Sequence, residues 1–505
     1  MSKETSLTRK ISVVVFSRML TTLIDAATAV IIARLLSKTD FAIVGYLLMV
    51  YEVCRYVATL GFPESIFYYF EHLTKNFRKA FALQTSAILL GTAVLTAGAI
   101  FLIRMFAPQL MSEFSPEVVD QIQTFLPLLA VIAVLEIPTW PVHNVLLALD
   151  RQREAGWYQI ITSAMSFAAL IGPLWLGYDV RFALYGMMGY AAIRFIGSAL
   201  WLMMVLPEGD LRTPKGNIIE QIRFSVPLGF SSLVNQFNKY IDKFVVSFFL
   251  TELALAEYQV GAQEVPIIRV IPFAVGSVLI SRYVKLKLQG EGQSLLELWH
   301  KGIEKVALLT VPLSALFIAL APDLIPLLFE TGDTNYTAAI IPFQIYNMIT
   351  LMRVAHFGSI LQAFGDTKGI LRISINLVVL NLIFSIPMTL QFGIIGTAAS
   401  TFLANLINMV ILLRLIAGHL KVSPVNVLPI LYYLKLLTLT VTLGAFGWAI
   451  RKFVFPEWSH TEGLLYVSVF YLTAFLLSGS ALRLIEKEDW KNLGDALRLD
   501  FLWRD

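Results

Sequence analysis

The stretch NQFNKYIDKF, residues 235–244, places two lysines, an aspartate and two asparagines inside a segment that is otherwise apolar. Lys239 and Lys243 are four residues apart and Asn235 lies one turn earlier, so a helix brings the three to one face. Ammonium groups bind phosphate oxygens through charge-assisted hydrogen bonds, and amides can bind sugar hydroxyls. We therefore expect Lys239 and Lys243 to bind an anionic ligand, with Asn235 and Asn238 beside it.

Two other interpretations of these lysines stay open. Asp242 follows Lys239 by three residues, so the two side chains could form a structural ion pair. Alternatively, both lysines could extend their ammonium groups to the membrane interface.

Further basic residues lie inside apolar segments. A charge at the centre of a bilayer costs roughly 2.5–3.5 kcal/mol, so such side chains must face water, a ligand or an acid. We expect four of them to contact the ligand together with the lysines: Arg18, Arg55, Arg269 and Arg353. For Arg55 the alternative is an ion pair with Glu52, three residues earlier. Arg194 and Lys435 are expected to support packing or to extend their charges to the membrane interface.

Acids in the same segments are candidates for ion coupling: Asp25, Glu52, Asp242 and Glu264. A buried carboxylate can take up and release a proton. The chain has no G-x-x-x-x-G-K-[ST] loop, and its six histidines have no metal-binding spacing. We therefore expect no cofactor, no metal site and no catalytic residue, and a gradient of H⁺ or Na⁺ as the driving force. Glu136, in LEIPTWP, has no expected role.

Membrane-spanning helices must position these residues. Of the 505 residues, 57% are hydrophobic and 15% are charged, whereas soluble proteins have about a quarter charged. Apolar runs of about 18 residues or more predict about fourteen spanning helices in an all-α polytopic membrane protein. Their expected limits are 9–35, 41–71, 80–106, 124–149, 156–176, 181–206, 219–250, 256–284, 302–329, 337–363, 370–390, 394–417, 426–450 and 463–484.

Lysine and arginine are distributed unevenly among the connecting loops. With the N-terminus in the cytoplasm, the inward segments hold about 25 of them and the outward loops about 6, which favours this orientation. Both termini are then cytoplasmic. Two inward segments, 288–305 and 485–503, have the apolar spacing of helices that lie along a membrane surface.

Prolines within the predicted spans should remove backbone hydrogen bonds and favour kinks. They are Pro63, Pro138, Pro227, Pro266, Pro272, Pro312 and Pro387. Pro266 and Pro272 bracket Arg269, so this helix is expected to bend beside the ligand.

A weak internal repeat lies at an offset of about 212 residues. Residues 37–53 align with 251–265, and Tyr46 then corresponds to Tyr258, and Glu52 to Glu264. The repeat predicts a six-helix unit that is used twice in one orientation, followed by two extra helices. Parallel repeats of this kind place the ligand site between the halves.

Two stretches resemble a known family. ARLLSKTDFAIVGYLLMVYE and LQAFGDTKGILRISINLVVLNLIFSIPMTLQFGIIGTAAS are similar to segments of the polysaccharide-flippase branch of the multidrug/oligosaccharidyl-lipid/polysaccharide exporter superfamily. The first resembles the turn from helix one into helix two, and the second resembles the Gly-Asp-Thr-Lys turn into helix eleven. The chain departs from a symmetric repeat at Glu257, where the first half has Gly45.

The resemblance implies two six-helix lobes around a central cavity lined by helices one, two, seven and eight. We expect an N-terminal lobe at 1–210, a C-terminal lobe at 211–420, two further helices at 421–484 and an amphipathic tail at 485–505. The implied activity is transfer of an undecaprenyl-diphosphate-linked oligosaccharide to the outer leaflet of a bacterial inner membrane by alternating access.

The implied partners are the lipid-linked oligosaccharide, membrane lipids and the polysaccharide assembly machinery, without nucleic acid, and the protein is expected to be a monomer and not an enzyme. Two alternatives stay open. One is a cation-coupled multidrug exporter of the same superfamily, although a basic site suits cationic drugs poorly. The other is a membrane glycan polymerase or ligase, although the longest outward loop, at 107–123, holds little chemistry.

Overall fold

The computed structural model describes residues 2–206, 217–332, 334–487 and 489–490, and every regular element in these ranges is a helix. Contacts between residues divide the chain into two compact units. Unit 1 comprises residues 1–259, 331–334 and 381–397, and unit 2 comprises the remainder. The all-α polytopic fold predicted from the hydropathy is confirmed.

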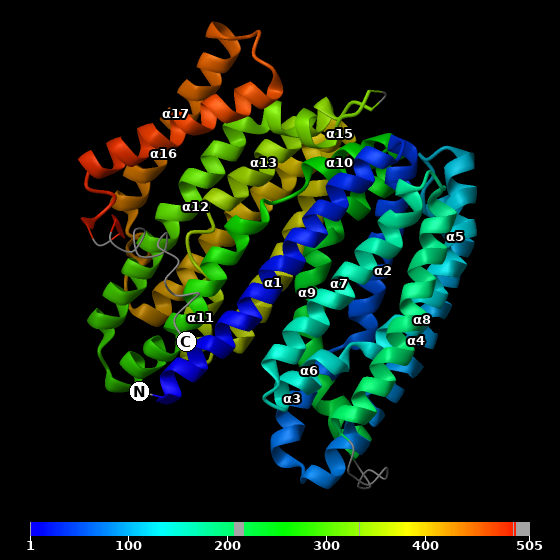
Figure 1. The fold of residues 1–505 in the computed structure, drawn as a ribbon. Helices are drawn as coiled ribbons and strands as arrows, with labels where there is room; N and C mark the ends of the chain where they lie inside the picture. The colour runs from blue at the N-terminus through cyan, green and yellow to red at the C-terminus, as the bar shows by residue number, and fades with distance from the viewer. Residues whose placement is uncertain (1, 207–216, 333, 488, 491–505) are drawn as a thin grey trace. The chain divides into compact units, whose positions relative to one another are not determined.

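Unit 1 contains the first ten α-helices of the chain (Figure 1). They are α1 (Ser2–Leu35), α2 (Lys38–Thr59), α3 (Phe62–His72), α4 (Lys75–Leu110), α5 (Pro116–Glu136), α6 (Pro141–Ala148), α7 (Gln152–Trp175), α8 (Val180–Val205), α9 (Asn217–Phe249) and α10 (Glu252–Gly261), whose last two residues count with unit 2. Within the unit, α1 packs along α7, α5 lies between α4 and α8, and α9 packs on α2 and α3.

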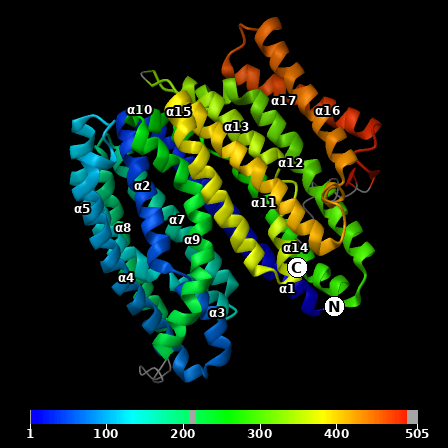
Figure 2. The same cartoon turned by 180° about the vertical axis from the view of Figure 1, so that it is seen from behind.

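Unit 2 contains most of the remaining helices, which Figure 2 shows from behind. They are α11 (Pro266–Gln289), α12 (Gly292–Phe329), α13 (Ile340–Leu351), α14 (Phe357–Phe364), α15 (Thr367–Leu420), α16 (Ile430–Ala449) and α17 (His460–Ala481). The middle of α15, residues 381–397, counts with unit 1. In this unit α12 is central and packs on α11, α13, α16 and α17. Its buried Trp299 donates a hydrogen bond of 2.9 Å to the Val427 carbonyl.

Each of the spans predicted from the sequence coincides with a helix or a broken helix. In the described part of the chain, nine helical stretches are long and apolar enough to cross a membrane. One of these stretches, α15, contains two predicted spans, and the four other predicted spans form α1, α7, α9 and the α13–α14 pair.

Helix α15 folds back on itself. Gly393 has φ 57° and ψ −141°, outside the helical region, at the position where the sequence separates two spans. Asp366 caps the start of α15, and its Oδ2 lies 2.8 Å from Nε2 of His419, in the last turn of the same helix. A straight helix would hold these two residues roughly 80 Å apart, so the two parts of α15 form a hairpin.

Prolines break some spans and leave others continuous. The backbone leaves the helix before Pro63, at Pro138 and before Pro266, where α3, a 3₁₀ turn (Ile137–Thr139) and α11 begin. The four other prolines lie inside single helices: Pro227, Pro272, Pro312 and Pro387.

The break between α2 and α3 is a close crossing of two backbones. Gly61 has φ +77°, and a Cβ there would lie 2.5 Å from the Ser225 carbonyl oxygen of α9. A Cβ on Gly229 would lie 2.0 Å from the carbonyl carbon of Leu60. Glycine is therefore required on both chains at this point, because any side chain would push them apart.

The segment 288–305 differs from its prediction. It is no separate surface helix: α11 ends at Gln289, Gly290 takes a left-handed cap, and α12 then runs without interruption from Gly292 to Phe329. Of the predicted tail helix at 485–503, residues 491–503 lie outside the described residues. Lys305 of α12 forms ion pairs with Glu486 and Asp489, at 3.3 and 2.7 Å, so the start of the tail is attached to α12.

The hairpin of α16 and α17 is fastened to the end of α12 by a buried acid. Asp323 accepts two hydrogen bonds of 3.1 Å from Arg451, and its Oδ1 lies 2.8 Å from Nδ1 of His460. Arg451 also donates to the Trp458 carbonyl in the turn of the hairpin. One carboxylate thus joins α12, the end of α16 and the start of α17.

Candidate functional site

Within unit 1, α1, α2 and α9 bring charged residues close together. Asp25 of α1 lies close enough to Glu52 of α2 and to Lys239 of α9 to experience both charges. Asp25 and Lys239 are exposed, and Glu52 is half-buried. Three of the residues selected from the sequence, separated by up to 214 positions, therefore share one site.

The two lysines of α9 lie close to the same aromatic ring. The ammonium nitrogens of Lys239 and Lys243 lie 5.1 and 5.7 Å from the centre of the Tyr240 ring. Asn235, one turn earlier, is exposed like Lys239, while Asn238 is half-buried. Lys243 is half-buried as well, so the basic and amide face of this helix is most accessible at Asn235 and Lys239.

Asp242 turns away from that face. It is 2% exposed and accepts a hydrogen bond of 2.9 Å from the hydroxyl of Tyr258 on α10. A second bond, of 2.8 Å, comes from the backbone N–H of Lys243. This aspartate lies in the interior of unit 1, where it connects α9 to α10.

Arg55 is buried and forms the predicted ion pair with Glu52 on the same helix. Its guanidinium lies flat over Trp140, 3.9 Å from the ring centre, and 4.4 Å from the ring centre of Tyr56. Only 5% of the residue is exposed. In this conformation the guanidinium of Arg55 is engaged by Glu52 and by the two aromatic rings rather than directed toward an external ligand.

A second ion pair, which the sequence did not suggest, lies behind the first. Glu136, at the end of α5, pairs with Arg194 of α8 and accepts a hydrogen bond of 2.6 Å from the hydroxyl of Tyr51 on α2. The guanidinium of Arg194 lies 5.4 Å from the centre of the Trp140 ring, and the same ring also contacts Arg55. The only sequence signal was the occurrence of both charges within apolar spans.

Arg18, on α1, is exposed two turns before Asp25. Its backbone carbonyl accepts hydrogen bonds from the hydroxyls of Thr21 and Thr22, at 3.0 and 2.8 Å. Its charge is close enough to act on His143 of α6. Arg18 therefore belongs to unit 1 together with Asp25 and Glu52.

The remaining predicted site residues are in unit 2. Arg353, between α13 and α14, forms an ion pair with Glu264, in the break between α10 and α11. Glu264 corresponds to Glu52 in the repeat, so both repeat-related acids have an arginine partner within their own unit. The side chain of Arg269 lies outside the described residues.

Glu257, the departure from the repeat, also has a defined contact. It forms an ion pair of 2.8 Å with Lys38 at the start of α2. A Cβ on Gly45 would lie 1.8 Å from Oε1 of Gln259, so the glycine of the first half makes room for the side chain of α10. The two members of the repeat therefore differ because they pack against each other.

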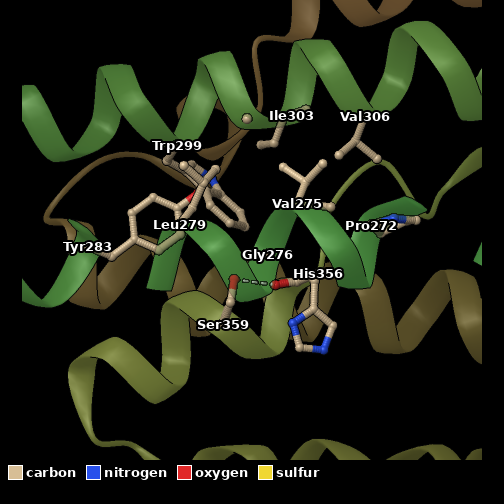
Figure 3. A pocket seen from close by; sticks show the side chains of 12 residues that line it. Pro272, Val275, Gly276, Leu279, Tyr283, Trp299, Ile303, Val306, His356 and Ser359 are labelled. Atoms are coloured by element: carbon tan, nitrogen blue, oxygen red, sulfur yellow. Dashed lines mark hydrogen bonds between the residues drawn. The ribbon is translucent and has the colours of Figure 1, made fainter. Parts of the chain in front are cut away.

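Unit 2 contains a small pocket between α11, α12 and α14 (Figure 3). Its volume of about 10 Å³ corresponds to roughly one water molecule. His356 and Ser359 line it from one side and Trp299 from another (Figure 3). The pocket is too small for a lipid head group. In the described residues, no group of three or more His, Cys, Asp or Glu side chains could hold a metal ion.

Two protein families match long parts of the chain. The family described as polysaccharide biosynthesis protein matches residues 7–287, and the family described as lipid II flippase MurJ matches residues 203–469. Each match covers more than half of the chain.

A curated relative matches a shorter segment. The probable low-salt glycan biosynthesis flippase Agl15 of Haloferax volcanii is 24% identical over 181 residues, which are 36% of this chain and 38% of that protein. The match thus spans about two fifths of the length of the curated relative.

Solved structures with the same fold include two transporters. Lipid II flippase MurJ in an inward closed conformation has a TM-score of 0.66 and 16% identity, covering 94% of this chain and 99% of that one. An inward-facing multidrug resistance MATE family transporter has a TM-score of 0.62 and 15% identity, covering 80% and 96%. At these identities the likeness shows the fold alone.

Proposed function

The chain belongs to the polysaccharide biosynthesis protein family, in the flippase branch of the multidrug/oligosaccharidyl-lipid/polysaccharide exporter superfamily, and from this premise we propose that it is a flippase for a lipid-linked oligosaccharide. The substrate is undecaprenyl diphosphate bearing a sugar chain, which the protein transfers to the outer leaflet of the bacterial inner membrane by alternating access. Both termini of the multi-pass chain face the cytoplasm, and the protein acts as a monomer, without catalysis and without nucleic acid.

The observation that carries this proposal is the accessible basic and amide face of α9. Lys239 and Lys243 stand beside one aromatic ring, with Asn235 one turn away. Two ammonium groups suit the several acceptor oxygens of a diphosphate, and the amides suit sugar hydroxyls. An exposed lysine in a membrane-spanning helix, such as Lys239, needs an aqueous or anionic environment, and a passing head group supplies one.

We propose that Asp25 couples transport to an ion gradient, because it is an exposed acid between a lysine and a second acid. Glu52, Glu264 and Asp242 remain candidates for the same role, although each has a defined cationic or hydrogen-bond partner. The runner-up function is a cation-coupled multidrug exporter, which the MATE-like fold favours. The basic face of α9 favours an anionic substrate instead.

The test is translocation in vesicles that contain the purified full-length protein and a fluorescent undecaprenyl-diphosphate oligosaccharide. Replacing Lys239 and Lys243 together with Gln should reduce the translocation rate at least tenfold, because each lysine donates charge-assisted bonds worth roughly 1.5–3 kcal/mol. Lys435→Gln, at an exposed lysine of α16, is the matched control and should leave the rate unchanged.

An undiminished rate in the double variant would refute the lysines as the head-group site. If the wild-type protein moves a fluorescent cationic drug and not the glycolipid, the multidrug exporter is the correct function. Dissipating a proton or sodium gradient in the same vesicles identifies the coupling ion.

A further inference from the structure

A set of charged side chains around one tryptophan links the surroundings of Asp25 to α8 within unit 1. It runs from Asp25 through Glu52 and Arg55 to the Trp140 ring, and from this ring through Arg194 to Glu136. We infer that Glu136 and Arg194 are positioning residues, which keep Arg55 on Glu52 and thereby set the charge that Asp25 faces. The effect of these residues on translocation rests on the proposed function, whereas their effect on the charge around Asp25 does not.

The first step of the argument concerns the two arginines. Arg55 and Arg194 both approach Trp140, with their guanidinium carbons 3.9 and 5.4 Å from its ring centre. Two cations near one ring repel each other, so each needs an acid of its own. Glu52 serves Arg55 and Glu136 serves Arg194, and both pairs are largely buried, where charges interact strongly.

The second step concerns what happens when one charge is removed. Without the carboxylate of Glu136, Arg194 retains its charge beside Trp140 and is drawn toward Glu52, the remaining acid of the network. Without the guanidinium of Arg194, Glu136 instead draws Arg55 away from Glu52. The two changes therefore alter the charge on the Asp25 side of the network in opposite directions.

Among the described side chains, two charged groups from other helices act on Asp25. From α2 it faces Glu52 and from α9 Lys239, while Arg18 stands two turns away on its own helix. Helix α7 packs along α1, but its two charged residues, at 153 and 154, are in its first turn. On α9, the other nearby charges are those of Asp242 and Lys243, which interact with each other. Glu52 is thus the route by which the interior charges reach Asp25.

Carbodiimide labelling tests the inference, because the reagent modifies a carboxylic acid only in its protonated form. The full-length protein in lipid nanodiscs is labelled at a series of pH values, and mass spectrometry of the peptide with Asp25 gives the pH of half-labelling. Glu136→Gln removes a negative charge and should lower this pH by about 0.5–1 unit. Arg194→Gln should raise it by about as much, and the double variant should return it close to the wild-type value.

Two control variants separate charge from general damage. Arg194→Lys keeps the positive charge, so its pH of half-labelling should stay close to the wild-type value and show little of the shift caused by Arg194→Gln. Tyr51→Phe removes the hydrogen bond to Glu136 without changing a charge, and should leave the pH of half-labelling in place. If Glu136→Gln does not fold, Glu136→Asp withdraws the same carboxylate from Arg194 and should lower the value to a smaller extent.

The inference is overturned if both single variants shift the pH of half-labelling in the same direction, or if neither shifts it. Translocation is then measured in the same proteins, where the pH optimum should follow the labelling. Absence of glycolipid translocation in the wild-type protein would defeat the proposed function. It would leave the labelling result, and with it the positioning role, intact.

Discussion

Asp366 performs two tasks at the start of α15. Its Oδ1 accepts a hydrogen bond of 2.8 Å from the backbone N–H of Gly369, and its Oδ2 lies 2.8 Å from Nε2 of His419. The bond with His419, followed by the bond with Gly369, lowers the pKa of the Asp366 carboxyl below its usual value. The ionised carboxylate is therefore the form that stabilises the folded protein.

This lowered pKa predicts how the contribution of Asp366 to stability depends on pH. Its stabilisation is complete above the unfolded pKa of about 4 and is lost as the pH falls through the lower folded pKa. Asp366→Asn should therefore unfold more easily at neutral pH, by about 1 kcal/mol or less, because the half-buried group is still partly screened by solvent. Thermal unfolding in detergent at several pH values measures the difference.

The difference between the two proteins should vanish at the lowest pH, where both carry an uncharged group at position 366. A variant that is equally destabilised at every pH would contradict the role of the carboxylate charge. Lys368→Gln, in the same turn, is the control.

At the residue scale, sequence reasoning finds the charges and the partners that lie one helix turn away, as for Glu52 and Arg55, but not the partners on other helices. Lys239 and Asp25 stand out because ionisable groups are costly inside apolar spans. The network around Glu136 could not be read in this way, since its partners come from α2 and α8, 85 and 58 residues away. Such pairs follow from helix packing, which no local pattern records.

At the element scale, the crossing of α9 over the break between α2 and α3 depends on two glycines. Gly229→Ala would place a methyl group 2.3 Å from the carbonyl oxygen of Leu60. The two backbones must then separate, and overpacking of this kind costs about 1–3 kcal/mol. We expect a lower unfolding temperature, measured by thermal denaturation in detergent micelles.

The matched control is Gly91→Ala, on the exposed side of α4, where a Cβ meets no atom within 4 Å. Alanine favours the helix by up to about 1 kcal/mol at such a position. The two substitutions should therefore change stability in opposite directions. A Gly229→Ala protein as stable as the wild type would show that the crossing is loose.

Hydropathy predicts the helices themselves well and their continuity less well. The turn at Gly393 was expected and is present, because a short polar interruption separates two long apolar runs. The prediction of a separate surface helix at 288–305, made from its amphipathic pattern, is wrong. It belongs largely to α12, because Leu295, Trp299 and Ile303 pack into the core of unit 2 and extend the helix beyond its apolar section.

At the scale of the whole molecule, each unit has its own core and its own buried ion pairs. The α16–α17 hairpin, which follows the repeat, contains none of the predicted site residues. Its attachment depends on Asp323, which is 5% exposed and is shared by Arg451 and His460. The hairpin should therefore contribute to stability and not to substrate binding.

This division of tasks gives a further prediction. Arg451→Gln leaves the buried carboxylate of Asp323 without its strongest partner, which should destabilise the protein by on the order of 3 kcal/mol. Translocation per folded molecule should remain at the wild-type level. Unfolding temperature and transport in proteoliposomes, measured on one preparation, check the two statements. A strong loss of transport in folded Arg451→Gln protein would assign the hairpin a part in the transport cycle.

The contact between Asp366 and His419 also bears on how the chain enters the membrane. The two residues are 53 positions apart, and a ribosome adding about 5–20 residues per second makes that length in roughly 3–10 s. During that interval the Asp366 carboxylate cannot contact His419, because His419 has not yet been synthesised. The contact that closes the hairpin therefore forms only after His419 has been synthesised, so a chain stalled shortly after Gly393 would lack it.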